Sequence, residues 1–231
     1  TLSGSKAGGD ISNFSALMVA MAATVGTGNI IGVGTAIALG GPGAVFWCWL
    51  TGVFGIATKY AEALLSVKYR YKTESGTMIG GPMVVLEKAL KMKPLAIFFC
   101  ITTICAAFGI GNMNQANSVS VLLTENFGIS PYITGVVMAV LIGFITFGGI
   151  KWLARVCEVF VPIMALIYII GCVAILILNY QWVGTAIELI ITSAFTPQAL
   201  GGGLTGGGIM IAMRYGISRG LFSNESGLGS A

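Results

Sequence analysis

The chain contains no histidine, and only 9% of its 231 residues are charged. Histidine is the usual general base near neutral pH and a common zinc ligand, so its absence argues against hydrolytic and metal-assisted chemistry. The five cysteines show no C-x-x-C spacing, and each lies in an apolar stretch, which predicts free thiols. We therefore do not expect an enzyme.

Apolar sequence is what the chain has in abundance. Hydrophobic residues make up 56% of it, and the mean hydropathy is +0.92. This composition is typical of a polytopic membrane protein. The net charge of +4 is small, and the basic residues gather in particular loops, so the charge informs topology and indicates no nucleic-acid partner. We predict an all-α, multi-pass helical bundle in the lipid bilayer of the cell membrane.

Charge-free runs predict six spans, because about 20 residues cross the hydrocarbon core as a helix. The runs lack the period-two alternation of strands. The predicted spans are residues 11–39, 43–67, 95–123, 131–147 and 153–178, with a sixth span that begins near residue 206.

The basic residues orient these spans. Lysines and arginines crowd residues 68–93 and follow the fourth span, whereas the other connections, including residues 179–188, carry none. By the positive-inside rule, the basic loops are cytoplasmic. Within the first basic loop, residues 82–92 have helical apolar spacing, which predicts either a helix on the inner membrane surface or an ordinary solvated loop helix.

The first span is interrupted near its middle by the run Val25-Gly26-Thr27-Gly28-Asn29. Glycine loosens a helix, and asparagine needs hydrogen-bond partners that hydrocarbon does not supply, so we predict that the helix breaks here. Amides freed at the start of the second half suit an anionic group, and carbonyls freed at the end of the first half suit a cation. A zwitterion together with Na⁺ supplies both. The alternative is that Gly28 and Gly32 form a small-residue packing seam.

A second polar cluster interrupts the third span. At helical spacing, Gly111, Gln115 and Ser118 share one face. Gln115 is therefore a candidate for binding the carboxylate or ammonium of a substrate. The alternative is hydrogen bonding between helices without substrate contact.

Several motifs are specific enough to indicate a family. Gly40-Gly41-Pro42-Gly43 runs into Phe46-Trp47-Cys48-Trp49, Gly26-Thr27-Gly28-Asn29 precedes this block, and Lys59-Tyr60-Ala61-Glu62 follows it. With these motifs the chain resembles the alanine or glycine:cation symporter family, the sodium:alanine symporters, although Cys48 stands where that family usually has Met. Residues 220–231 are similar to the family as well, with Ser226 where Ala is more common.

The resemblance implies the LeuT-type fold of the APC superfamily. In that fold two inverted repeats of five helices surround a midplane site, and the first and sixth core helices are unwound. Residues 11–178 would form the first repeat, and residues 206–231 would start the second with its own break at 223–229. Residues 1–231 would then be one incomplete transmembrane domain. Ten or more spans of about 20 residues need a longer chain, so we expect this piece alone not to transport.

The resemblance also implies roles for residues of the first break. The carbonyls of Ala22 and Val25 would help to hold one sodium ion. The Thr24 carbonyl and the Asn29 side chain would hold another. The amides at the break are candidates for the substrate carboxylate, and these are the amides of Gly26, Thr27 and Gly28.

In the second break, Glu225 would pair with Arg214 or Arg219 or bias cation binding, and the alternative is a buried structural ion pair. The function implied is sodium-driven symport of alanine or glycine by alternating access, with Na⁺ as a co-transported ion and no cofactor. A proton-coupled amino-acid carrier on the same fold and a cation channel lined by the polar breaks remain alternatives. A membrane-embedded enzyme is disfavoured because histidine and any paired nucleophile and base are missing.

Overall fold

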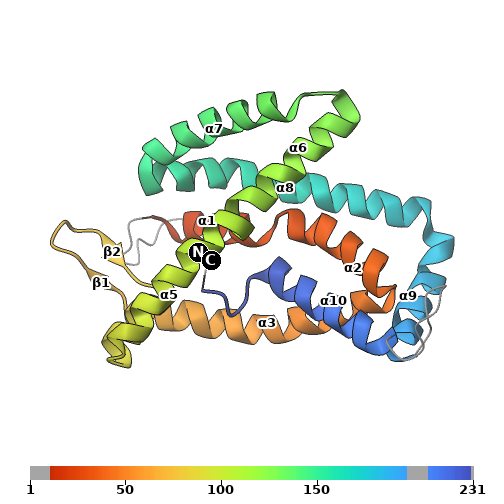
Figure 1. Ribbon diagram of the computed structural model, residues 1–231, viewed down its shortest axis with the longest axis horizontal. Helices are drawn as coiled ribbons and strands as arrows, with labels where there is room; N and C mark the ends of the chain where they lie inside the picture. The colour runs from red at the N-terminus through yellow and green to blue at the C-terminus, as the bar shows by residue number, and fades with distance from the viewer. Residues whose placement is uncertain (1–10, 197–207, 230–231) are drawn as a thin grey trace. The chain divides into compact units, whose positions relative to one another are not determined.

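The computed structural model describes residues 11–196 and 208–229, and these residues are almost entirely helical (Figure 1). The all-α prediction is confirmed for this part of the chain. The elements, in order, are α1 (Asn13–Thr24), η1 (Gly28–Gly32), α2 (Val33–Gly40), α3 (Gly43–Lys68), β1 (Tyr71–Lys72), β2 (Met78–Ile79), α4 (Pro82–Val84), η2 (Val85–Ala89), α5 (Lys93–Ala106), η3 (Ala107–Met113), α6 (Asn114–Phe127), α7 (Pro131–Phe147), α8 (Gly149–Leu178), α9 (Tyr180–Phe195) and α10 (Gly208–Asn224).

Within residues 11–196 and 208–229, two helical runs are long and apolar enough to cross a membrane. They are Lys93–Phe127, with 35 residues, and Gly149–Leu178, with 30 residues. A third is the pair Asn13–Thr24 and Gly28–Gly40, which meet at a bend of 42°. α7 has the bounds predicted for the fourth span, but it is a shorter apolar helix. α3 has 26 residues and is not among these candidates.

Proline and glycine residues set several of the helix boundaries. α7 begins with Pro131 in its first turn, where the missing amide of proline does no harm. α6 ends at Gly128, whose left-handed φ of 67° suits a helix C-terminus. Gly41, with a φ of 76°, separates α2 from α3 in the same way. These residues explain why the predicted ends of several helices lie close to the observed ones.

The structure adds detail to two of the predicted connections. Residues 179–188, which the sequence predicts as a connection between spans, are helical, because α9 covers Tyr180–Phe195. The missing lysines and arginines mark a side of the membrane and not a loop, and the apolar residues from Val183 to Ile191 recur at helical spacing. The first basic loop also contains a hairpin, in which Tyr71 pairs with Ile79 and Lys72 with Met78. The expected short helix is present there but ends at Ala89.

The chain divides into two compact units. The described residues of the first unit are 11–22 and 61–160, and those of the second are 23–60, 161–196 and 208–229. Helices α1, α3 and α8 each contribute to both units. The five cysteines are free, as predicted.

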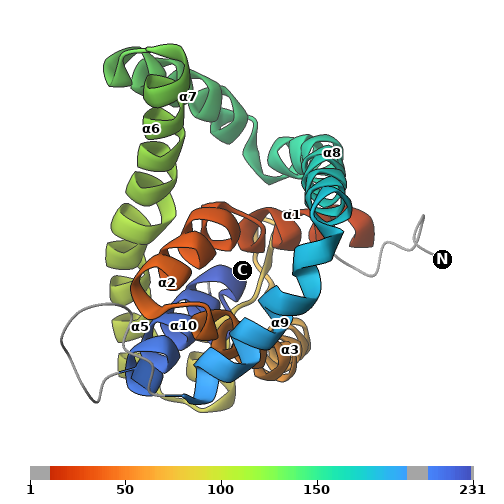
Figure 2. The ribbon, with the colours of Figure 1, turned by 90° about the vertical axis from the view of Figure 1, so that its right-hand side faces the viewer.

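In the second unit, α10 packs closely against α2 and α3 (Figure 2). Glycines allow this approach. A Cβ added at Gly216 would lie 2.4 Å from the carbonyl oxygen of Ala44, and one at Gly40 would lie 3.1 Å from Cβ of Tyr215. α9 reaches the start of α3, where the rings of Phe46 and Phe195 have centroids 5.0 Å apart. The unit is therefore held by backbone contact and by one aromatic cluster.

Candidate functional site

The first helix breaks where the sequence predicts. α1 ends at Thr24, Val25 and Gly26 form a bend, and helical structure resumes at Thr27. A π-helical turn, Gly28–Gly32, then leads into α2. Because a helix end leaves its last four carbonyls without amides of the same helix, the break needs other donors.

Asn29 provides one of these donors and forms hydrogen bonds across the break. Its side-chain Nδ2 donates a hydrogen bond to the carbonyl oxygen of Thr24 at 2.9 Å. Its backbone amide donates to the carbonyl of Gly26 at 3.1 Å. The two groups that the resemblance assigns to a sodium ion, the Thr24 carbonyl and the Asn29 side chain, thus lie in direct contact.

The end of α10 meets the break within the second unit. The Ser223 hydroxyl donates a hydrogen bond to Oδ1 of Asn29. Gly28 is buried, and a Cβ added to it would lie 3.0 Å from a ring carbon of Phe222. The packing seam considered for Gly28 is therefore present. This packing involves the α-carbon of Gly28 and not its amide. The role of that amide as a ligand therefore stays a prediction.

The predicted second break begins as α10 ends at Asn224. Glu225 has a left-handed φ of 49°, and a turn follows over residues 226–228. Asn224 stabilises this turn, since its Oδ1 accepts a hydrogen bond from the Ser226 amide at 3.1 Å. Its Nδ2 also donates to the carbonyl of Thr51 in α3 at 3.4 Å. Polar contacts of this second break therefore tie it to both α3 and the first break.

The proposed ion pair of Glu225 stays a prediction. Arg214 lies ten residues before the end of α10, about 15 Å along a helix that rises 1.5 Å per residue. Arg219 lies about half as far from that end. The geometry thus favours Arg219 over Arg214 as a partner for the Glu225 carboxylate.

Gln115 lies in the first unit, in a groove of about 770 Å³ between α6 and α7. The groove places Gln115 beside Gly111, as the predicted shared face requires, but Ser118 does not line it. The Ser118 hydroxyl instead donates to the carbonyl of Asn114 at 2.9 Å. Gln115 and Ser118 both lie in α6, about 60° apart around the helix axis, and only Gln115 borders the groove. The substrate role of Gln115 stays a prediction.

Sequence reasoning missed two polar contacts. One is Ser223 as the partner of Asn29, and the other is a cluster of Ser12, Ser15 and Glu158 in the first unit. Glu158 is the sole carboxylate of α8, and an ionisable residue in a predicted span is a signal for function. That signal was available from the sequence, whereas the partners of Glu158 were not.

Comparison with known proteins now identifies the family. Residues 1–231 match the family described as the sodium:alanine symporter family. The chain belongs to this family. It is 50% identical over 227 residues to the sodium/alanine symporter AgcS of Methanococcus maripaludis, and 48% identical over 224 residues to an uncharacterized transporter of Haemophilus influenzae. Each alignment covers 96% of the chain and 49% of the relative.

The name of a third relative includes protons as well as sodium. The putative sodium/proton-dependent alanine carrier protein YrbD of Bacillus subtilis is 40% identical over 220 residues, which cover 95% of the chain and 44% of that relative. The chain spans about half the length of the curated relatives it matches. Membership confirms the resemblance and places the chain among membrane transporters and not among enzymes.

Proposed function

We propose that the full-length protein containing this chain is a sodium-coupled symporter of a small neutral amino acid, alanine or glycine. The observation that carries the proposal is the interrupted first helix, with Asn29 bridging Thr24 on one side and Ser223 of α10 on the other. A broken helix in a membrane segment is where a transporter of this type places its solute and ion.

The chemistry of the break suits both ligands. Amides at the start of a helix carry partial positive charge, so those of Gly26, Thr27 and Gly28 suit the amino-acid carboxylate. Carbonyls at the end of a helix suit a cation. In this proposal the carbonyls of Ala22 and Val25 bind one sodium ion, and the Thr24 carbonyl together with Asn29 binds another. Gln115 hydrogen-bonds the solute.

The proposed architecture is the LeuT-type fold, with residues 11–178 as the first repeat and residue 206 onward as the start of the second. Meeting of the two polar breaks through Asn29 and Ser223 supports this arrangement, because the fold requires the first helices of both repeats to adjoin. Helices beyond this chain would complete the site. We therefore expect the 231-residue piece in liposomes to show no sodium-driven uptake.

Coupling follows if sodium orders the same break that offers amides to the carboxylate. Each ligand then raises the affinity for the other, since coupling free energy is reciprocal. One charge that crosses 100 mV is worth about 2.3 kcal/mol, which supports about 50-fold accumulation before any chemical gradient is counted. This mechanism needs a single state that binds both ligands.

A proton-coupled carrier is the second candidate, because the name of YrbD includes both sodium and protons. Uptake of labelled alanine into liposomes that contain the full-length protein separates the two. We expect saturable uptake that needs external Na⁺ and disappears when choline replaces Na⁺ at fixed pH. Uptake that persists in choline and follows a proton gradient would support the second candidate. Conductance without saturable alanine dependence would indicate a channel.

A further inference from the structure

The start of α1 is tied to α8 by side-chain hydrogen bonds within the first unit. The Ser15 hydroxyl donates to Oε1 of Glu158, and the Ser12 hydroxyl lies 3.5 Å from the same oxygen. The two hydroxyl oxygens are 2.7 Å apart. Oγ of Ser12 also accepts a hydrogen bond from the backbone amide of Ser15 at 3.0 Å, as the side chain of a helix N-cap residue does. Both hydroxyls at the first turn of α1 thus lie within hydrogen-bond distance of one carboxylate oxygen of Glu158.

This contact lies where a carboxylate is costly without partners. Ser15 is 5% exposed, and Glu158 is half-buried in a helix that is otherwise apolar over most of its length. A carboxylate in such a place needs hydrogen-bond donors, and bonds to an ionised acceptor are stronger than neutral ones. Glu158 follows Arg155 by one turn, and the positive-inside rule puts that end of α8 at the cytoplasmic side.

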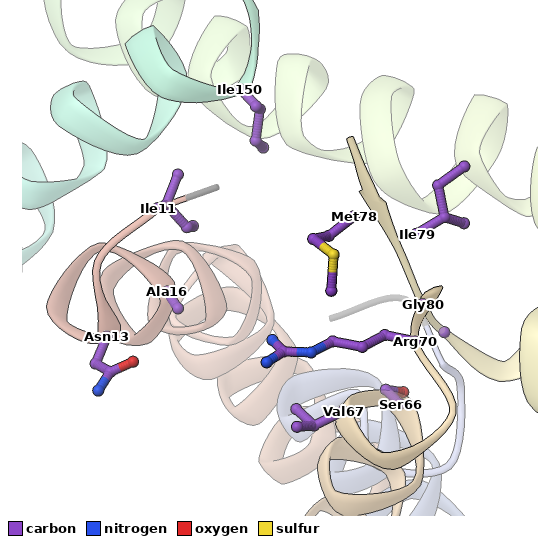
Figure 3. Close-up of a pocket in the computed structure, with 11 residues that line it drawn as sticks. Ile11, Asn13, Ala16, Ser66, Val67, Arg70, Met78, Ile79, Gly80 and Ile150 are labelled. Carbon is purple, nitrogen blue, oxygen red and sulfur yellow. The ribbon is translucent and has the colours of Figure 1, made fainter. Parts of the chain in front are cut away.

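Next to this contact, α1 borders a hollow (Figure 3). The cavity has a volume of about 480 Å³, and Asn13 and Ala16 of α1 line one side of it. Met78 of the hairpin and Ile150 of α8 line other parts. Asn13 directly follows Ser12, and Ala16 directly follows Ser15. Each residue turns an α-helix by about 100°, so the cavity lies about 100° around α1 from the hydrogen bonds. The first turn of α1 is therefore fastened on one face and open on another.

We propose that Ser12, Ser15 and Glu158 form a latch that holds the cytoplasmic half of the broken first helix against α8. Glu158 is the positioning residue of this latch. The inference rests on the proposed symport, in which the first half-helix moves when the site opens to the cytoplasm. Opening the latch exchanges a few hydrogen bonds for water contacts, and the adjacent cavity gives α1 space into which to shift.

The test measures how accessible α1 is in the full-length protein. Met18 follows Ser15 by one turn and is 5% exposed, so a cysteine there reports detachment of the helix. Met18→Cys is placed in a background without native cysteines, and a membrane-impermeant maleimide is applied from the cytoplasmic side. We expect Glu158→Leu to speed labelling about tenfold, which corresponds to about 1.4 kcal/mol and is of the size expected for hydrogen bonds to a charged group.

Two further variants make the result specific. The amide oxygen of Glu158→Gln still accepts hydrogen bonds from the serines, although weaker ones, so its labelling rate should be at most about threefold above the parent rate. Glu188→Leu removes an exposed carboxylate from α9 and should have no effect. If Glu158→Leu labels at the parent rate, or if Glu158→Gln labels as fast as Glu158→Leu, the latch is overturned.

Should Glu158→Leu fail to fold, Ser12→Ala with Ser15→Ala decides the matter, because small polar-to-Ala changes leave the α8 side of the contact intact. Labelling at least threefold above the parent supports the latch, and the parent rate overturns it. Uptake assays add a second readout, in which Glu158→Leu should change kcat while KM for alanine stays within about twofold. A protein without sodium-driven uptake but with the expected labelling pattern would sink the proposed symport and not the latch.

Discussion

Two polar regions interrupt apolar helices in this chain, and they are built differently. At the first break, Asn29 bonds to Thr24 and to Ser223, and Gly28 is buried against Phe222. In the second region, by contrast, Asn112 of η3 and Asn117 of α6 are exposed beside a groove, and Gln115 of α6 is half-buried there. The break is a structural joint as well as a candidate ligand site, whereas the polar residues of the second region line a groove between α6 and α7. Stability and ligand binding should therefore respond together at the first region and separately at the second.

The largest loss of stability is expected for Gly216→Val, which tests how α10 packs against α3. A Cβ at this position would lie 2.4 Å from the Ala44 carbonyl oxygen and 2.5 Å from Cβ of Trp47, so α10 must move away from α3. We expect a loss of about 3 kcal/mol or more, seen as a lower Tm in detergent and a poor yield of monodisperse protein. Gly171→Ala is the matched control, because nothing lies within 4 Å of the added atom. An unchanged Tm for Gly216→Val would show that α10 is not packed as described.

Gly28→Ala tests whether the joint and the ligand site are one region. The added Cβ would lie 3.0 Å from Phe222 and 3.3 Å from Cα of Ser223, so the end of α10 must yield. We expect a loss of about 1–2 kcal/mol in stability and weaker sodium-dependent alanine binding. Gly34→Ala in the next helix has nothing within 4 Å and should be neutral or slightly stabilising. If Gly28→Ala and Gly34→Ala have the same stability and the same alanine binding, the first break is not a region where packing and ligand binding respond together.

A double-mutant cycle of Asn29→Ala and Ser223→Ala measures the bond that joins the two breaks. Each change removes one partner of a part-buried hydrogen bond, so the two effects on unfolding free energy should not add. We expect a coupling energy of about 1 kcal/mol in unfolding measured by circular dichroism. Strict additivity would indicate that the end of α10 and the first break are energetically independent.

The smallest expected effect on stability belongs to Gln115→Ala. The side chain lines the groove and is only half-buried, so the unfolding free energy should change by less than about 0.5 kcal/mol. Apparent alanine affinity in the full-length protein should fall about fivefold, as expected when one hydrogen bond to the ligand is lost. Asn126→Ala, at an exposed position of the same helix, is the control. An unchanged affinity would remove Gln115 from the site.

The sequence predicts what depends on local chemistry. The glycines and Asn29 indicate the break, and proline and glycine punctuation gives the bounds of α7, because these residues restrict the backbone wherever they occur. No helix is predicted over the residues of α9, although their apolar side chains recur at helical spacing. The pairs Asn29 with Ser223 and Ser15 with Glu158 join residues 194 and 143 positions apart, and no local pattern encodes such partners.

Both polar regions include a turn of π-helix, Gly28–Gly32 in one and Ala107–Met113 in the other. Such a turn accommodates one residue more than the α-helix around it. Deleting a single residue there would restore ordinary α-helical winding while the helix downstream keeps its orientation. Length changes of one residue can thus alter the side chains that each polar region presents and leave the packed helices in place.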